Sequence, residues 1–207
     1  MIRWRSGITG LALAGVLAAA ANAVPPGPRD PDWPCQQIKV PQLSLAAVWS
    51  GPPLDPQTTD WQHDQQVADL VHDIAQRREP LEQAKHKIET LALQARERKQ
   101  QKLLELFAGL FSVLDSERRL VVDGLSRFGV RQKELAASIR EDNEKLRTMQ
   151  ADPNADAGEV NQLVQRLTWQ AQIFQDRHQS LSYACEVPGK IEQRLFALSR
   201  TIQQQLE

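Results

Sequence analysis

The sequence lacks a charge imbalance and is poor in aromatic residues and glycine. The formal net charge of the 207-residue chain is -1 at pH 7, with 25 basic and 26 acidic side chains. Binding to nucleic acid needs a basic face, so this balance argues against a nucleic-acid partner. Aromatic residues make up only 5% of the chain, whereas Leu, Ala, Gln, Arg and Glu dominate after residue 60. That composition is typical of long helices and coiled coils.

Catalytic and metal-binding motifs are also missing. None of the four histidines, His63, His72, His86 and His178, has an HExxH or CxxC companion, and no glycine-rich phosphate loop is present. The pairs His63-Asp64 and His72-Asp73 place adjacent side chains in different directions on a helix, which is typical of solvated helix faces. We therefore expect no catalytic residue, no metal, no cofactor and no small-molecule substrate.

Cysteine is scarce, with only Cys35 and Cys185. Both lie in the part of the chain that we predict to be exported, and an oxidising compartment favours one intramolecular disulfide between them. Two free thiols are the alternative. A separation of about 150 residues does not fit a CxxC redox motif, which argues against a thiol-exchange enzyme.

Long apolar runs are absent except at the N-terminus. Arg3 and Arg5 precede an apolar stretch over residues 8–21, which ends in small residues. This is the layout of a secretory signal, so residues 1–23 are predicted to be removed by cleavage after Ala23, giving a periplasmic protein. An uncleaved anchor is the alternative, although about fifteen apolar residues fall short of the roughly twenty that cross a bilayer. Membrane contact is expected only through an uncleaved signal.

Proline is concentrated in one region, with nine of the twelve prolines between residues 25 and 56. Residues 24–58 are therefore predicted to form an extended segment with at most a short helical turn around residues 45–49. Its apolar content, which includes Trp33 and Trp49, is too high for a disordered linker. We expect the segment to lie against the helices and to be held there by Cys35.

Residues 59–207 are predicted to form an all-α domain. Two shorter helices meet near Pro80, which ends or kinks the first of them. A helix of about 75 Å is predicted over residues 101–150, followed by a turn at residues 151–158 and a second long helix. The sequence leaves open whether Pro188 kinks or breaks that last helix, but the apolar phase continues beyond it, which favours a kink.

The two long helices are predicted to form a long antiparallel coiled-coil hairpin. Their apolar residues recur at spacings of three and four, and folding back near Asn154 gives nearly every apolar residue an apolar partner. Predicted facing pairs include Met149 with Val160, Leu135 with Phe174, Phe128 with Leu181 and Leu114 with Leu195. On the returning helix the predicted seam is Val160, Val164, Leu167, Ala171, Phe174, His178, Leu181 and Cys185.

The predicted hairpin is wider in apolar surface at one end. Additional apolar residues lie off the seam between residues 103 and 125, so the helices within residues 60–98 are expected to cover this half as a four-helix bundle end. The other half is then a projecting two-helix arm. Gly124 and Gly129, which are costly inside a helix, are predicted to leave room for the segment around Cys35.

A polar layer interrupts the predicted seam where His178 falls opposite Gln132 and Arg131. Such a layer fixes the register of a coiled coil at some cost in stability. A metal-binding or proton-sensing role for His178 is the alternative, but no second ligand lies one turn away on the same face.

The candidate contact surface for a partner lies on the arm. Trp169 and Ile173 are one helical turn apart and off the predicted seam, close to Arg166. A two-helix arm has no further element to bury them, so they form a candidate aromatic anchor for a protein. The alternative is that arginine stems or the N-terminal segment cover Trp169.

Three short stretches of the sequence carry a resemblance. They are Asp32-Trp33-Pro34-Cys35, Leu106-Phe107-Ala108-Gly109-Leu110-Phe111 with Glu117-Arg118, and Cys185-Glu186-Val187-Pro188 before Ile191-Glu192-Gln193-Arg194-Leu195-Phe196. In these motifs the chain resembles a group of exported proteobacterial helical proteins to which no function is assigned. The resemblance covers most of the exported part and implies a Gram-negative periplasm, but no activity.

The sequence therefore favours a non-catalytic periplasmic interaction or scaffold protein. Its helical hairpin would bind a protein partner, whose identity the sequence does not name, or a second copy of the chain. A periplasmic chaperone or adaptor that holds apolar clients is the first alternative. A small-molecule or redox enzyme is the second.

Overall fold

A computed structural model describes residues 30–56 and 58–207. Within this part the protein is all-helical and contains no strand, which confirms the predicted all-α class. The predicted signal, residues 1–23, lies outside the described residues. None of the described helices combines the length and the apolar character needed to cross a membrane.

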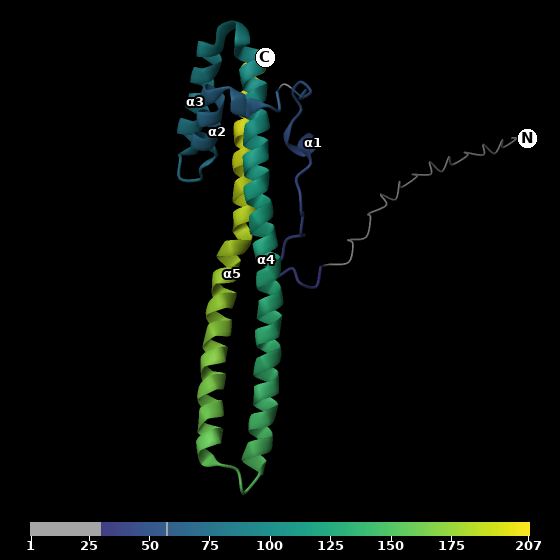
Figure 1. The fold of residues 1–207 in the computed structure, drawn as a ribbon, viewed down its shortest axis with the longest axis vertical. Helices are drawn as coiled ribbons and strands as arrows, with labels where there is room; N and C mark the ends of the chain where they lie inside the picture. The colour runs from purple at the N-terminus through teal and green to yellow at the C-terminus, as the bar shows by residue number, and fades with distance from the viewer. Residues whose placement is uncertain (1–29, 57) are drawn as a thin grey trace, which may run out of the picture.

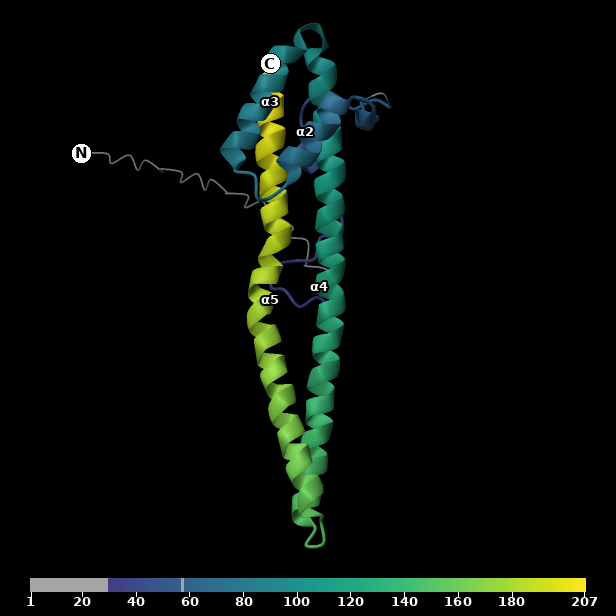
Figure 2. The same cartoon turned by 60° about the vertical axis from the view of Figure 1, so that its left-hand side comes forward.

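Two long helices run in opposite directions along the length of the molecule (Figure 1). The helical elements are α1 (Leu45–Val48), η1 (Trp61–His63), α2 (Gln65–Ala75), α3 (Leu81–Ala95), η2 (Arg96–Arg98), α4 (Lys99–Ala151) and α5 (Ala157–Leu206). α4 has 53 residues and α5 has 50, so each is about 75–80 Å long at 1.5 Å per residue. α2 and α3 lie beside only one end of this pair (Figure 2). We call that end the wide end, and the rest, residues 126–184, the arm.

Local chemistry accounts for where these helices begin. The side chain of Asp64 caps α2 by accepting the backbone N–H of Val67, and that of Asp156 caps α5 by accepting the N–H of Glu159. Pro80 separates α2 from α3 and occupies the N-cap of α3, so it breaks the helix there. Pro188, by contrast, lies inside a continuous α5.

The hydrophobic core lies at the wide end. α2 packs on α4, while α3 packs on both α4 and α5. Phe107 is fully buried, and its ring stacks on Trp49 with centroids 3.9 Å apart. Arg194 of α5 is also buried and donates hydrogen bonds to the carbonyl oxygens of Ile74 and Glu79. It therefore satisfies the end of α2 and joins the corner between α2 and α3 to α5.

Along the arm, polar contacts join α4 and α5 in an antiparallel order. Gln132 donates to the carbonyl of Phe174 at 3.4 Å, Gln170 donates to Ser138 at 3.3 Å, and Arg166 pairs with Asp142 at 3.4 Å. As the residue number rises on α4, the number of its partner on α5 falls. The contacts follow the order of facing residues expected from the sequence.

The face that α5 turns toward α4 differs by one residue from the predicted seam. Val164 is 40% exposed, and Ala171 and His178 are also exposed, whereas Leu163 is buried and Gln170 is half-buried. The predicted and the observed face share Leu167, Phe174 and Leu181. They differ in the second row of inward residues, which contains Val164 and Ala171 in the prediction and Leu163 and Gln170 in the structure. The larger Leu163 takes the inner place, and Gln170 is accommodated because Ser138 accepts its hydrogen bond.

Asp64 gives the wide end a pH-dependent contribution to stability. Burial alone would raise its pKa, but hydrogen bonds from Lys102 and the Val67 N–H, with the charges of Lys102 and Arg98, outweigh burial and hold the pKa below its ordinary value. A lowered pKa in the folded state stabilises the protein above the unfolded-state pKa, and this contribution is lost as the pH falls through the folded pKa.

We predict that Asp64→Asn, which keeps a good N-cap, lowers the free energy of unfolding at pH 6. The difference in unfolding free energy between the variant and the wild type should shrink as the pH is lowered below about 4, where Asp64 of the unfolded wild-type chain begins to be protonated. Urea unfolding at pH 6, 4 and 3 measures it. A difference that stays constant over this range would show that the charge of Asp64 does not contribute.

Candidate interaction surface

The structure leaves the predicted aromatic anchor on the arm uncovered. Trp169 is 68% exposed, and Ile173, one turn further along α5, is half-buried. The Arg166 guanidinium points to Asp142 of α4, so this arginine helps to join the two arm helices. Trp169 is therefore a large apolar side chain exposed on the arm, the part of the helix pair that α2 and α3 do not cover (Figure 2).

A second aromatic residue on the same helix was missed by the sequence prediction. Tyr183 is 72% exposed and follows Trp169 by 14 residues, or two heptads. In a coiled-coil helix, residues two heptads apart lie on the same face. The spacing between Trp169 and Tyr183 was the signal that could have identified it.

The structure does not bring the three residues of the predicted polar layer together. His178 and Arg131 are exposed, and only Gln132 lies half-buried toward α5, where it donates to the carbonyl of Phe174. The prediction was wrong for His178, which lies in the same row of α5 as the exposed Val164 and Ala171. The row that faces α4 is the neighbouring one, which contains Leu163 and Gln170.

The Pro-rich segment crosses the middle of the helix pair and is linked to it covalently. Cys35 and Cys185 form a disulfide, with their Cα atoms 5.7 Å apart, as expected from the cysteine count. Next to it, the Gln37 side chain donates to the carbonyl of Cys185, and the Trp33 indole donates to the carbonyl of Gln37. The disulfide thus fixes this segment to α5.

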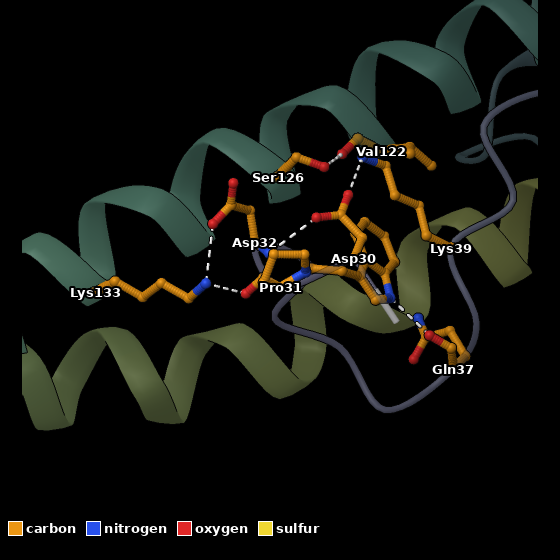
Figure 3. Close-up of polar contacts among 9 residues, drawn as sticks. Asp30, Pro31, Asp32, Gln37, Lys39, Val122, Ser126 and Lys133 are labelled. Carbon is orange, nitrogen blue, oxygen red and sulfur yellow. Dashed lines mark hydrogen bonds and ion pairs between the residues drawn. The ribbon is translucent and has the colours of Figure 1, made fainter. Parts of the chain in front are cut away.

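Polar contacts hold the same segment against α4. Lys133 donates to the carbonyl of Pro31 and pairs with Asp32 at 2.9 Å (Figure 3). Within the segment, Asp30 accepts the backbone N–H of Asp32 and pairs with Lys39 at 2.7 Å. The hydrogen bond from Lys39 and the Asp32 N–H, the two largest causes, lower the pKa of Asp30.

Two buried charged side chains of α4 hold the next part of the segment. Arg118 pairs with Glu192 of α5 at 2.5 Å and donates to the carbonyl of Val40 at 2.7 Å. Asp115 accepts the backbone N–H of Leu43 at 3.2 Å. Ile38 is 76% exposed and Val40 is also exposed. The apolar side chains of residues 38–40 therefore do not hold the segment against the helices. Apolar contact with the core begins further on, at the partly buried Leu43, and the first buried apolar residues are Val48 and Trp49.

Residues that are far apart in the sequence meet at this crossing. A small pocket of about 390 Å³ lies between the segment and the two long helices. Its lining includes Trp33, Arg118, Cys185, Glu186, Pro188 and Glu192. Among them, Cys185 joins the segment to α5 through the disulfide, and Arg118 joins it to α4 through the carbonyl of Val40.

Gly129 allows the segment to approach α4 closely, whereas Gly124 does not serve this purpose. A Cβ at Gly129 would collide with the carbonyl oxygen of Asp32 and lie 3.2 Å from Pro34 Cδ. At Gly124 the nearest atom would be the Arg127 side-chain end, 3.9 Å away. The prediction that both glycines make room is therefore correct for Gly129 only.

We predict opposite effects for the two alanine substitutions. Gly129→Ala should lower the free energy of unfolding by roughly 1–2 kcal/mol net, because overpacking outweighs the gain in helix propensity. Gly124→Ala, its control, should raise it by about 0.5–1 kcal/mol. Urea unfolding of both variants tests the prediction. Equal stabilisation of the two would mean that the segment does not rest on α4 at Gly129.

Within the described ranges, no group of three or more His, Cys, Asp or Glu side chains is placed to hold a metal ion. Comparison of the chain with protein-family profiles, curated proteins and solved structures finds no match.

Proposed function

We propose that the protein is a non-catalytic periplasmic interaction protein that binds another protein through its helical arm. In this proposal α4 and α5 form a long antiparallel coiled-coil hairpin, and α2 and α3 complete a four-helix bundle end. The arm then projects from the bundle and presents its outer face. The proposal extends to export by cleavage after Ala23.

The observation that carries the proposal is the exposure of Trp169 on the arm. Tryptophan is highly buried on average in folded proteins, and it is enriched among the residues that dominate binding energy at interfaces. The ion pair between Arg166 and Asp142 and the hydrogen bond between Gln170 and Ser138 lie on either side of it in the sequence. The helix that carries Trp169 is thereby held to α4, which orders the surface before binding.

Trp169→Ala is expected to weaken partner binding by about thirty-fold or more, the effect of a hot-spot residue worth about 2 kcal/mol. The free energy of unfolding should change by less than about 0.5 kcal/mol because the side chain is exposed. The matched control is Leu93→Ala, which removes an 81% exposed side chain from α3 and should leave binding intact. Co-purification of the full chain from cells of its natural host, quantified by mass spectrometry, measures binding.

The same experiment distinguishes the alternatives. A specific partner lost in Trp169→Ala and retained in Leu93→Ala supports the proposal. Many unrelated proteins retained by both variants would favour a chaperone that holds apolar clients. The redox-enzyme alternative would need Cys35 and Cys185 to be reduced and reactive in the native protein.

A further inference from the structure

The wide end shows how additional helices pack against α5. Arg194 reaches the corner between α2 and α3 through its hydrogen bonds to Ile74 and Glu79. Thr201 lies one heptad further along α5 and shares a pocket lining with Lys85 of α3. Both α5 side chains are buried. This row of α5 therefore faces α3 and the corner between α2 and α3.

The same row continues from Val187, which still packs against the core, into the arm, where α2 and α3 do not cover it. Counting back from Arg194 in steps of seven gives Val187, Ser180, Ile173 and Arg166, which we call the lateral row. Val187 and Ile173 are half-buried, while Ser180 is exposed. In Figure 1, α2 and α3 lie beside the upper part of α5 only, and no described element continues their path along the arm.

Two exposed aromatic side chains edge the lateral row. Trp169 lies one turn before Ile173, and Tyr183 lies one turn before Val187. Each pair combines an exposed ring with a half-buried aliphatic side chain, and the pairs are two heptads, or about 21 Å, apart. A helix lying along α5 with apolar residues at spacings of three and four would meet both pairs.

The exposed charges beside the lateral row are of both signs. A partner therefore needs polar side chains opposite them but no net charge of one sign. Asp176 and Arg177 lie between the two aromatic pairs and are both exposed. Asp176 accepts a hydrogen bond from Gln172, and Arg177 has no ion pair among the residues that the structure describes. An amphipathic helix with mixed charges beside its apolar stripe would complement them.

A second copy of this chain is a poorer fit. An antiparallel copy that paired lateral rows about Ser180 would bring its tip, at Ala157, level with residue 203 of the first copy. α3 already packs against α5 at the wide end, so the tip would meet an occupied face. A single helix of about 20 residues spans Arg166 to Val187, about 31 Å, without reaching it.

We propose that the lateral row of the arm, with Trp169 and Tyr183 at its edge, binds an amphipathic helix of another protein. That helix lies along α5 as a third helix, continuing the path that α3 takes at the wide end. The inference rests on the proposed function, because it names the class of partner for the same arm.

The test places the photo-crosslinker p-benzoylphenylalanine at position 180 of the full chain in cells of its natural host. The control places it at position 93. The crosslinked segment is mapped by mass spectrometry and synthesised as a peptide. We expect crosslinks at position 180 only, to one segment with apolar residues at spacings of three and four. The peptide should gain helical circular dichroism on binding, and Ile173→Arg should weaken it at least ten-fold, with Leu93→Arg as the unaffected control.

The other outcomes overturn the inference. Crosslinks to an extended segment, to a folded surface without a helix, to a second copy of the chain, or to no protein each exclude an amphipathic helix of another protein as the occupant. If the partner is nevertheless lost in Trp169→Ala, the proposed function stands while this inference fails. If Trp169→Ala retains all partners, the proposed function itself fails.

Discussion

Replacing Phe107 by alanine is expected to lower the free energy of unfolding by about 3–5 kcal/mol. Phe107 is 0% exposed, and its ring stacks on that of Trp49 with centroids 3.9 Å apart and lies 6.2 Å from the ring of Phe111. The substitution removes a fully buried ring of α4 that stacks on Trp49 and leaves a cavity in its place.

Urea unfolding followed by circular dichroism measures this loss. Phe196→Ala is the matched control, because Phe196 is 45% exposed and should cost less than about 1 kcal/mol. Similar losses for the two variants would contradict the placement of the core at the wide end.

The second large effect is expected when the disulfide is removed. The double variant Cys35→Ala, Cys185→Ala should lose about 2–4 kcal/mol of unfolding free energy, since the link closes a loop of about 150 residues and restricts the unfolded chain. Locally, residues 31–43 should become mobile. Their remaining polar contacts to the helices come from Lys133, Arg118 and Asp115. At the end of the stretch Leu43 packs against the core but is only partly buried.

Urea unfolding and amide hydrogen exchange measure the two parts of this prediction. Exchange should accelerate in residues 31–43 and remain slow in α4 around Phe107. Adding a reducing agent should reproduce the effect in the wild type and leave the double variant unchanged. A double variant with wild-type stability and a protected segment would show that the polar contacts suffice without the covalent link.

The helical organisation was largely predictable because it follows from local rules. Pro80 separates α2 from α3 as proline chemistry requires, and the turn residues after Ala151 end α4 close to the expected position. The disulfide was predictable from the presence of only two cysteines in a chain whose first residues have the layout expected of an export signal. These features depend on residue type and spacing alone.

The finer geometry of the arm was less predictable. Two neighbouring rows of α5 both show spacings of three and four, and choosing between Leu163 and Val164, or Gln170 and Ala171, depends on the partner helix. Gln170 faces inward because Ser138 is positioned to accept its hydrogen bond. Hydrophobic pattern favoured Ala171 there and placed His178 in the seam.

Other details depend on contacts between distant parts of the chain. Arg118 and Arg194 are buried because they donate hydrogen bonds to backbone carbonyls far away in the sequence. The residues next to each arginine in the sequence do not indicate which carbonyl it will meet. The exposure of Trp169 was predictable because its neighbours on the arm are few. Tyr183 shares that face at a spacing of two heptads.

Both proposals require that α4 and α5 lie against each other along the arm, with the Trp169 face turned outward. The most direct test is the distance between spin labels at Arg140 and Thr168, measured by pulsed electron paramagnetic resonance. Both positions are exposed, and they lie between the contacts Ser138 to Gln170 and Asp142 to Arg166. Packed helix axes are about 8–10 Å apart, so we predict a short, narrow distance distribution. A distance near 42 Å, the length of about 28 residues in one uninterrupted helix, would contradict the account.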